Sequence, residues 1–122
     1  MTRIRGDLRE RTFEFGCGIL DLSSEFPHDP RGWVLAKQVI RSGTSIGANV
    51  READNALTDA DFSHKCGIAR KEAAETHYWL DLCTAAGVLP AASTEKLLVE
   101  ADELARILST IVQKTQDFLR KQ

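Results

Sequence analysis

Arg41-Ser42-Gly43-Thr44-Ser45-Ile46-Gly47-Ala48-Asn49-Val50-Arg51-Glu52-Ala53 is the stretch that decides how this chain folds. It places small and polar residues where a packed helix normally carries large apolar ones. If the stretch is helical, Arg41, Ser45 and Asn49 recur at four-residue intervals, and Glu52 continues the same face. We therefore expect this row of polar side chains to require partners on a neighbouring helix.

The same stretch contains two glycines, Gly43 and Gly47, which interrupt an otherwise apolar helix face. Each glycine lowers helix propensity by roughly 1 kcal/mol relative to alanine. We interpret them as positions of close backbone approach or of a local kink.

Outside this stretch, apolar residues recur at alternating intervals of four and three, which is typical of helices that bury a seam. The seams are Leu8, Thr12, Phe15, Ile19, Leu22 and Phe26; then Phe62, Cys66, Ala69, Ala73, Thr76, Leu80 and Cys83; and finally Leu97, Ala101, Leu104, Leu108, Ile111, Thr115 and Phe118. Helix starts are marked by the capping residues Asp29 before Pro30, Thr58 and Ser93. We predict helices over about 7–26, 30–55, 59–87 and 93–121 and no strand. Short connections between such helices predict an all-α fold, an antiparallel up-down-up-down four-helix bundle that forms a single domain over residues 1–122.

The composition is that of an ordinary globular protein, with 122 residues and a net charge of −2. No apolar run approaches the roughly 18 residues of a membrane span, and the N-terminus lacks the apolar core of a secretory signal. We expect a cytoplasmic protein with no membrane association. The cysteines Cys17, Cys66 and Cys83 lack a C-x-x-C pair, so we interpret them as buried small hydrophobic residues and expect neither a metal site nor a cofactor.

Positive charge is concentrated in blocks despite the acidic total. The candidates for contacts with nucleic-acid phosphates are Arg31, Lys37, Arg51, Lys65, Arg70 and Lys71. The alternative is that these bases lie on solvated faces and in pairs between subunits.

Antiparallel packing of the second and third predicted helices places Arg41 level with Glu72 and Glu75. We expect a largely buried ion pair there, with Ser45 and Asn49 completing the hydrogen bonds of a structural polar cluster. A ligand pocket is the alternative interpretation of the same five residues.

The chain also resembles a known family, the four-helix-bundle proteins related to those encoded in intervening sequences of bacterial 23S ribosomal RNA genes. The resemblance rests on Leu8-Arg9-Glu10-Arg11-Thr12-Phe13, on Arg41 to Asn49, and on Asp61-Phe62 with Ile68 to Leu80. Many relatives carry proline at the position of Gly47 and glycine at that of Asp54. The resemblance implies a bundle that assembles into a ring, a homo-oligomer of five subunits, with no established enzymatic activity.

No combination of residues in the sequence satisfies the requirements of a catalytic site, such as a nucleophile beside a base, so we expect no enzyme. Phe13 and Leu20 lie outside the first seam, which provides more apolar surface than one bundle core needs and favours self-assembly. The leading hypothesis is therefore a non-enzymatic oligomeric bundle that binds RNA or a ribonucleoprotein through its ring surface. The alternative is a scaffold or adaptor that binds only protein.

Overall fold

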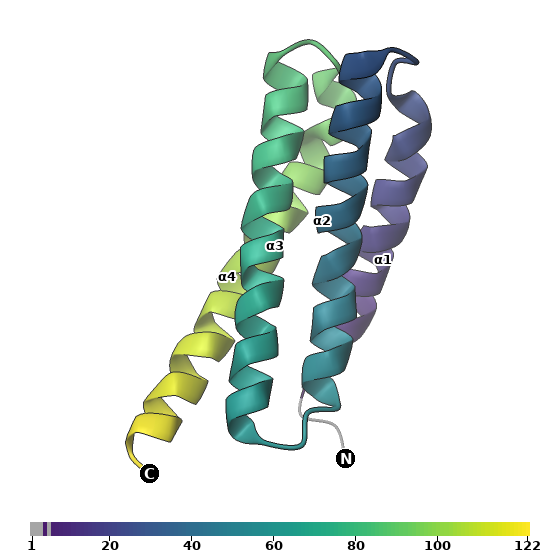
Figure 1. Cartoon of the computed structure of the whole chain (residues 1–122). Coiled ribbons are helices and arrows are strands. Elements are labelled where there is room, and N and C mark those ends of the chain that lie inside the picture. The colour runs from purple at the N-terminus through teal and green to yellow at the C-terminus, as the bar shows by residue number, and fades with distance from the viewer. Residues whose placement is uncertain (1–3, 5) are drawn as a thin grey trace.

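The computed structural model describes residue 4 and residues 6–122, and within them the chain forms helices and no strand. The helices are α1 (Leu8–Leu22), the short 3₁₀ helix η1 (Ser23–Glu25), α2 (Pro30–Asp54), α3 (Asp59–Ala85) and α4 (Ala91–Arg120). The four α-helices alternate in direction along the bundle (Figure 1), so the prediction of an all-α antiparallel four-helix bundle is confirmed. Within the described residues, none of these helices combines the length and apolar character that a membrane span requires.

Two of the predicted helix starts are confirmed by their capping contacts. The side chain of Asp29 accepts a hydrogen bond from the Gly32 amide at 2.8 Å, directly before Pro30 opens α2. The Thr58 hydroxyl accepts one from the Asp61 amide at 3.0 Å at the start of α3. Both contacts satisfy an amide that has no carbonyl partner within its helix.

The predicted cap of the last helix is wrong. α4 begins at Ala91, after Pro90, and has no side-chain cap. Ser93 lies in the first turn instead, and its hydroxyl donates a 2.6 Å hydrogen bond to Glu25 Oε1. Pro90 is suited to this position directly before α4, because proline has no backbone N–H and cannot continue a helical hydrogen-bond pattern from the residues before it.

The first helix ends at Leu22 and not at Phe26 as predicted. Residues Ser23–Glu25 form the 3₁₀ turn, and Phe26 is extended (φ −69°, ψ 141°). The residue before a proline is disfavoured in the helical region, so Pro27 forces this ending. Phe26 nevertheless stays in the core at 5% exposure.

The predicted seams of α1 and α3 form the core, whereas the seam of α4 is fully buried only in its middle turns. All seam residues of α1 and α3 are buried, as are Ala101, Leu104 and Leu108 of α4. Phe118, by contrast, is 52% exposed, and Val112 is the last buried residue of α4 within the described part of the chain. The final turns of α4 diverge from the other helices (Figure 1), which accounts for the exposure of Phe118.

The glycines of α2 mark close approach between α2 and α1. A Cβ atom at Gly43 would lie 2.7 Å from Cγ1 of Ile19, and one at Gly47 would lie 3.1 Å from the backbone oxygen of Thr12. Ile19 is fully buried and β-branched, so it has little freedom to move. The structure thus explains these glycines by packing, since α2 remains a continuous helix through both.

We predict opposite effects for alanine at two helical glycines. Gly43→Ala should lower the free energy of unfolding by about 1–3 kcal/mol because the added methyl overpacks the contact with Ile19. The matched control is Gly67→Ala in α3, where a Cβ atom meets nothing within 4 Å. This change should raise the free energy of unfolding by about 0.5–1 kcal/mol through helix propensity alone. Urea unfolding measures both, and an equal gain at the two sites would contradict the close approach.

Candidate functional site

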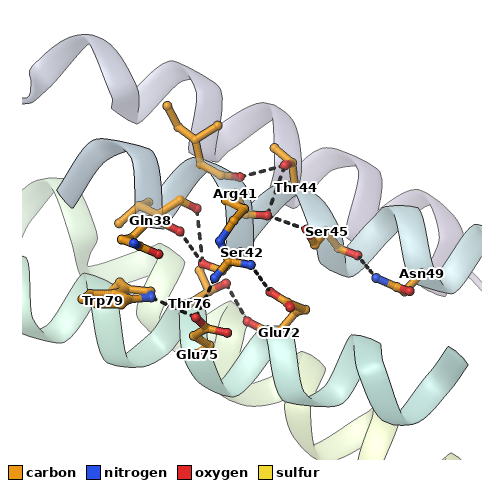
Figure 2. Close-up of polar contacts among 12 residues, drawn as sticks. Gln38, Arg41, Ser42, Thr44, Ser45, Asn49, Glu72, Glu75, Thr76 and Trp79 are labelled. Carbon is orange, nitrogen blue, oxygen red and sulfur yellow. Dashed lines mark hydrogen bonds and ion pairs between the residues drawn. The ribbon is translucent and has the colours of Figure 1, made fainter. Parts of the chain in front are cut away.

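The polar face of α2 lies against α3 and forms a polar cluster, which we define as Arg41, Glu72, Glu75 and Trp79 (Figure 2). Arg41 Nη2 lies 2.6 Å from Glu75 Oε1, and its Nη1 lies 3.7 Å from Glu72 Oε2. The indole of Trp79 donates a 3.4 Å hydrogen bond to the same Glu75 oxygen. The ion pair expected from helix register is therefore present, with the guanidinium between the two carboxylates.

The expected burial of this ion pair is wrong. The Arg41 side chain is 49% exposed, and those of Glu72 and Glu75 are 14% and 31% exposed. Water therefore screens the guanidinium, and a pair of this kind contributes only about 0–1 kcal/mol. The buried Oε2 atom of Glu72 accepts no hydrogen bond and has only the longer ionic contact with Arg41.

The expected part of Ser45 and Asn49 in this cluster is also wrong. The Ser45 hydroxyl donates to the Arg41 carbonyl at 2.5 Å, and the Asn49 amide donates to the Ser45 carbonyl at 2.9 Å. Both side chains thus bind their own helix (Figure 2). Serine and asparagine side chains in helices commonly form such hydrogen bonds, because the backbone carbonyl one turn earlier lies within reach of a short polar side chain.

A second feature is a groove between α1 and α2 with a volume of about 350 Å³. We call it the α1–α2 groove. Its lining is Arg9, Thr12, Phe13, Gly16, Cys17, Leu20, Thr44, Gly47, Ala48 and Arg51. Phe13 and Leu20 are 58% and 53% exposed, and Cys17 is exposed although we expected it to be buried. The error has a simple cause, because Cys17 lies outside the α1 seam, on the face that no other helix covers.

Charged residues surround one end of the α1–α2 groove. The Arg51 guanidinium lies 5.9 Å from the centre of the Phe13 ring, within cation–π range. An adjoining depression contains Asp7 and Glu10 beside Phe13 and Arg51. The groove therefore combines an apolar floor with both signs of charge at its mouth.

The six candidate phosphate contacts do not form one surface. Arg31 donates to the Ala86 carbonyl at 3.1 Å, near the end of α3. It is separated from Arg51 by about 30 Å along α2, at 1.5 Å per residue. Lys37 is exposed in the first half of α2, and Arg70 and Lys71 are exposed in the middle of α3.

Of these six, Arg51 and Lys65 line one depression, and there they accompany Glu52 and Asp61. Lys65 Nζ lies 3.0 Å from Glu52 Oε1. This hydrogen bond raises the pKa of Lys65 above its ordinary value. Lys65 is thus paired within its own chain, whereas the alternative interpretation expected solvated faces or pairs between subunits.

Two charged contacts were not anticipated from the sequence. Asp54, which is 1% exposed, accepts hydrogen bonds from the Ile4 amide at 2.7 Å and from Arg9 Nη1 at 3.0 Å. Arg11 binds Glu100 of α4 through two hydrogen bonds of 2.6 and 3.1 Å, which raise the pKa of Arg11. The sequence feature that could have indicated the Asp54 contact is that Asp54 replaces the glycine common in relatives. The Arg11 contact joins the first and last helices, so no local sequence pattern indicates it.

The remaining cysteines are buried as expected. Burial raises the pKa of the Cys66 thiol to about 11 and also raises that of Cys83. Both therefore remain protonated at neutral pH. Residues 4 and 6–122 contain no group of three or more His, Cys, Asp or Glu side chains arranged to hold a metal ion.

We predict that the Arg41 ion pair makes a small contribution to stability. In a double-mutant cycle of Arg41→Ala and Glu75→Ala, the coupling should be about 0.5–1 kcal/mol because the pair is half exposed. Arg41→Ala should cost more in the wild type than in a Glu72→Gln background, since only the wild type leaves a poorly solvated carboxylate behind. A coupling above about 3 kcal/mol, as found for buried pairs, would contradict the half-exposed position of the guanidinium.

Comparison with known proteins agrees with this architecture. A family model described as "23S rRNA-intervening sequence protein" matches residues 7–110. A solved structure of a protein of unknown function from the S23 ribosomal protein family of Bacteroides thetaiotaomicron is 37% identical, covers 86% of this chain and 97% of its own, and superposes with a TM-score of 0.80. Comparison with curated protein sequences gives no significant match. The chain therefore belongs to the family of 23S rRNA-intervening sequence proteins.

Proposed function

We propose that this chain is a non-enzymatic cytoplasmic protein that assembles into a homo-oligomeric ring and binds RNA or a ribonucleoprotein through the ring surface. Five subunits are expected from the family resemblance. The observation that carries the proposal is the exposed apolar α1–α2 groove, which the bundle core does not use. Apolar surface of this kind, bordered by charged residues, commonly marks an interaction site.

Three further observations support an RNA partner. Arg70 and Lys71 are exposed on α3, and Lys37 is exposed on α2. The family description refers to 23S rRNA, and the solved relative is assigned to a ribosomal protein family. Because a single subunit presents few bases on any one face, a ring that repeats them would gain affinity for a polyanion through multivalency.

A protein-binding scaffold is the second candidate function. The pairing of bases within the subunit favours it, since Lys65 is held by Glu52 and Arg11 by Glu100. Bases that are neutralised internally contribute less to phosphate binding.

We predict that the wild-type chain sediments as an oligomer at micromolar concentration, with five times the 13.5 kDa mass of one chain expected. Replacing Phe13 and Leu20 together by serine should weaken self-association at least tenfold, because it removes exposed apolar area from the groove. Leu57→Ser, at a 93% exposed position between α2 and α3, is the control and should change little. A wild-type chain that sediments as a monomer would disprove the assembly.

We predict salt-sensitive RNA binding that depends on α3. Replacing Arg70 and Lys71 together by glutamine should weaken binding to structured RNA and reduce the slope of log affinity against log salt by roughly 1.4–1.8, since each phosphate neutralised by a base accounts for about 0.7–0.9 of that slope. Fluorescence anisotropy over a salt series measures both quantities. The matched control replaces Lys96 and Arg106, two exposed bases of α4, and should leave both nearly unchanged.

The salt series also separates the two candidate functions. Binding that is absent even at low salt would remove RNA as the partner and leave the protein-binding scaffold. Equal losses in the α3 variant and the α4 control would show that net charge alone, and no particular surface, governs binding.

A further inference from the structure

The end of α4 is less covered by its own chain than the rest of the helix (Figure 1). We define the α4 tip as residues 113–120, which follow Val112, the last buried residue of this helix in the described chain. The polar contacts of α4 described above come from its first half, where Glu100 binds Arg11 of α1 and Ser93 binds Glu25 of η1. The tip remains helical while it diverges from the bundle (Figure 1), and it carries Phe118 at 52% exposure.

The α1–α2 groove is shaped to accept an aromatic side chain. Its volume of about 350 Å³ exceeds the roughly 150 Å³ of an apolar cavity that binds benzene. Gly16, Gly47 and Ala48 keep it open because they add little side-chain volume. Phe13 and Leu20 form apolar walls of the kind that pack against an aromatic ring.

The end of the chain around Phe118 is basic and the depression that adjoins the groove contains two acids, whereas the charged residues lining the groove itself, Arg9 and Arg51, are basic. Lys114 and Lys121 lie four residues before and three residues after Phe118, so both flank its ring on the helix surface, and both are exposed. Asp7 and Glu10 are exposed in the depression that adjoins the groove. A tip that places Phe118 in the groove would bring two lysines to this acidic edge.

We propose that the α4 tip of one copy docks in the α1–α2 groove of a second copy, with Phe118 as its anchor. This inference rests on the proposed self-assembly and names the surfaces that would carry it. Because the tip and the groove are different surfaces, the contact is heterologous: every subunit donates one tip and accepts another, which forms a ring when the rotation closes.

Filling the groove tests the acceptor side. A Cβ atom at Gly16 meets nothing within 4 Å, so Gly16→Leu should fill the groove without disturbing the core. We expect it to weaken self-association at least tenfold in sedimentation experiments. Gly67→Leu is a matched control, because it makes the same change at another helical glycine with open surroundings, and it should have less than a twofold effect.

Charge exchange tests the orientation of the contact in a way that loss of folding cannot imitate. Glu10→Lys and Lys121→Glu should each weaken assembly, and the double variant should recover most of the loss because each copy then restores the opposite pair. Losses that simply accumulate in the double variant would contradict this pairing.

A peptide isolates the interaction from assembly. The Phe118→Glu chain should have an empty groove, and a fluorescein-labelled peptide of residues 107–122 should bind it and protect Cys17 from alkylation. Cys17 is suited to report this because it lines the groove and is exposed, whereas Cys66 and Cys83 are buried. Adding Gly16→Leu to the Phe118→Glu chain should abolish binding, and adding Gly67→Leu should not.

Two results would overturn the inference and are distinguishable from failure of the proposed function. If Gly16→Leu and Phe118→Glu chains assemble like the wild type, the ring exists but uses other surfaces. If RNA protects Cys17 and the peptide does not, the groove is a nucleic-acid site. A monomeric wild type, by contrast, would remove both the docking and the proposed assembly.

Discussion

The close approach of α1 and α2 at Gly43 is the constraint on which the other contacts depend. With no side chain at this position, α2 packs directly on the buried Ile19. That contact fixes the rotation of α2 about its axis. Arg41, two residues earlier and therefore about 200° away around the helix, then faces α3 and its carboxylates. A single stretch of small and polar residues thus determines how α2 packs against both α1 and α3.

Charged and polar contacts near the helix ends align α1 with its two neighbours. Asp54, at the end of α2, accepts hydrogen bonds from the Ile4 amide and from Arg9. Glu100 of α4 accepts a hydrogen bond from Arg11 of α1. The Arg9 and Arg11 side chains remain partly exposed, so water screens both ion pairs in part. Their larger effect is on specificity, because a helix shifted by one turn would leave the buried Asp54 carboxylate without these donors.

The distribution of surface features is the reason why we propose that the chain works as an assembly. The exposed bases among the described residues are spread over α2, α3 and α4, and some bases are already paired. A surface of this kind attracts a polyanion weakly unless several copies are held together. The apolar groove and the diverging end of α4 are features that the isolated bundle leaves unsatisfied, and in the proposed ring they would satisfy each other.

The sequence by itself determined the helices, the buried seams and the register that sets Arg41 opposite Glu72 and Glu75, because helical periodicity reports which residues share a face. Only the tertiary structure decided that Arg41 stays half exposed, that Phe118 leaves the seam and that Cys17 opens onto a groove. These outcomes depend on which neighbour covers each face and for how many turns. Periodicity along one helix carries no information about the length or divergence of another, so burial at the ends and edges of the bundle became visible only once the helices were placed together.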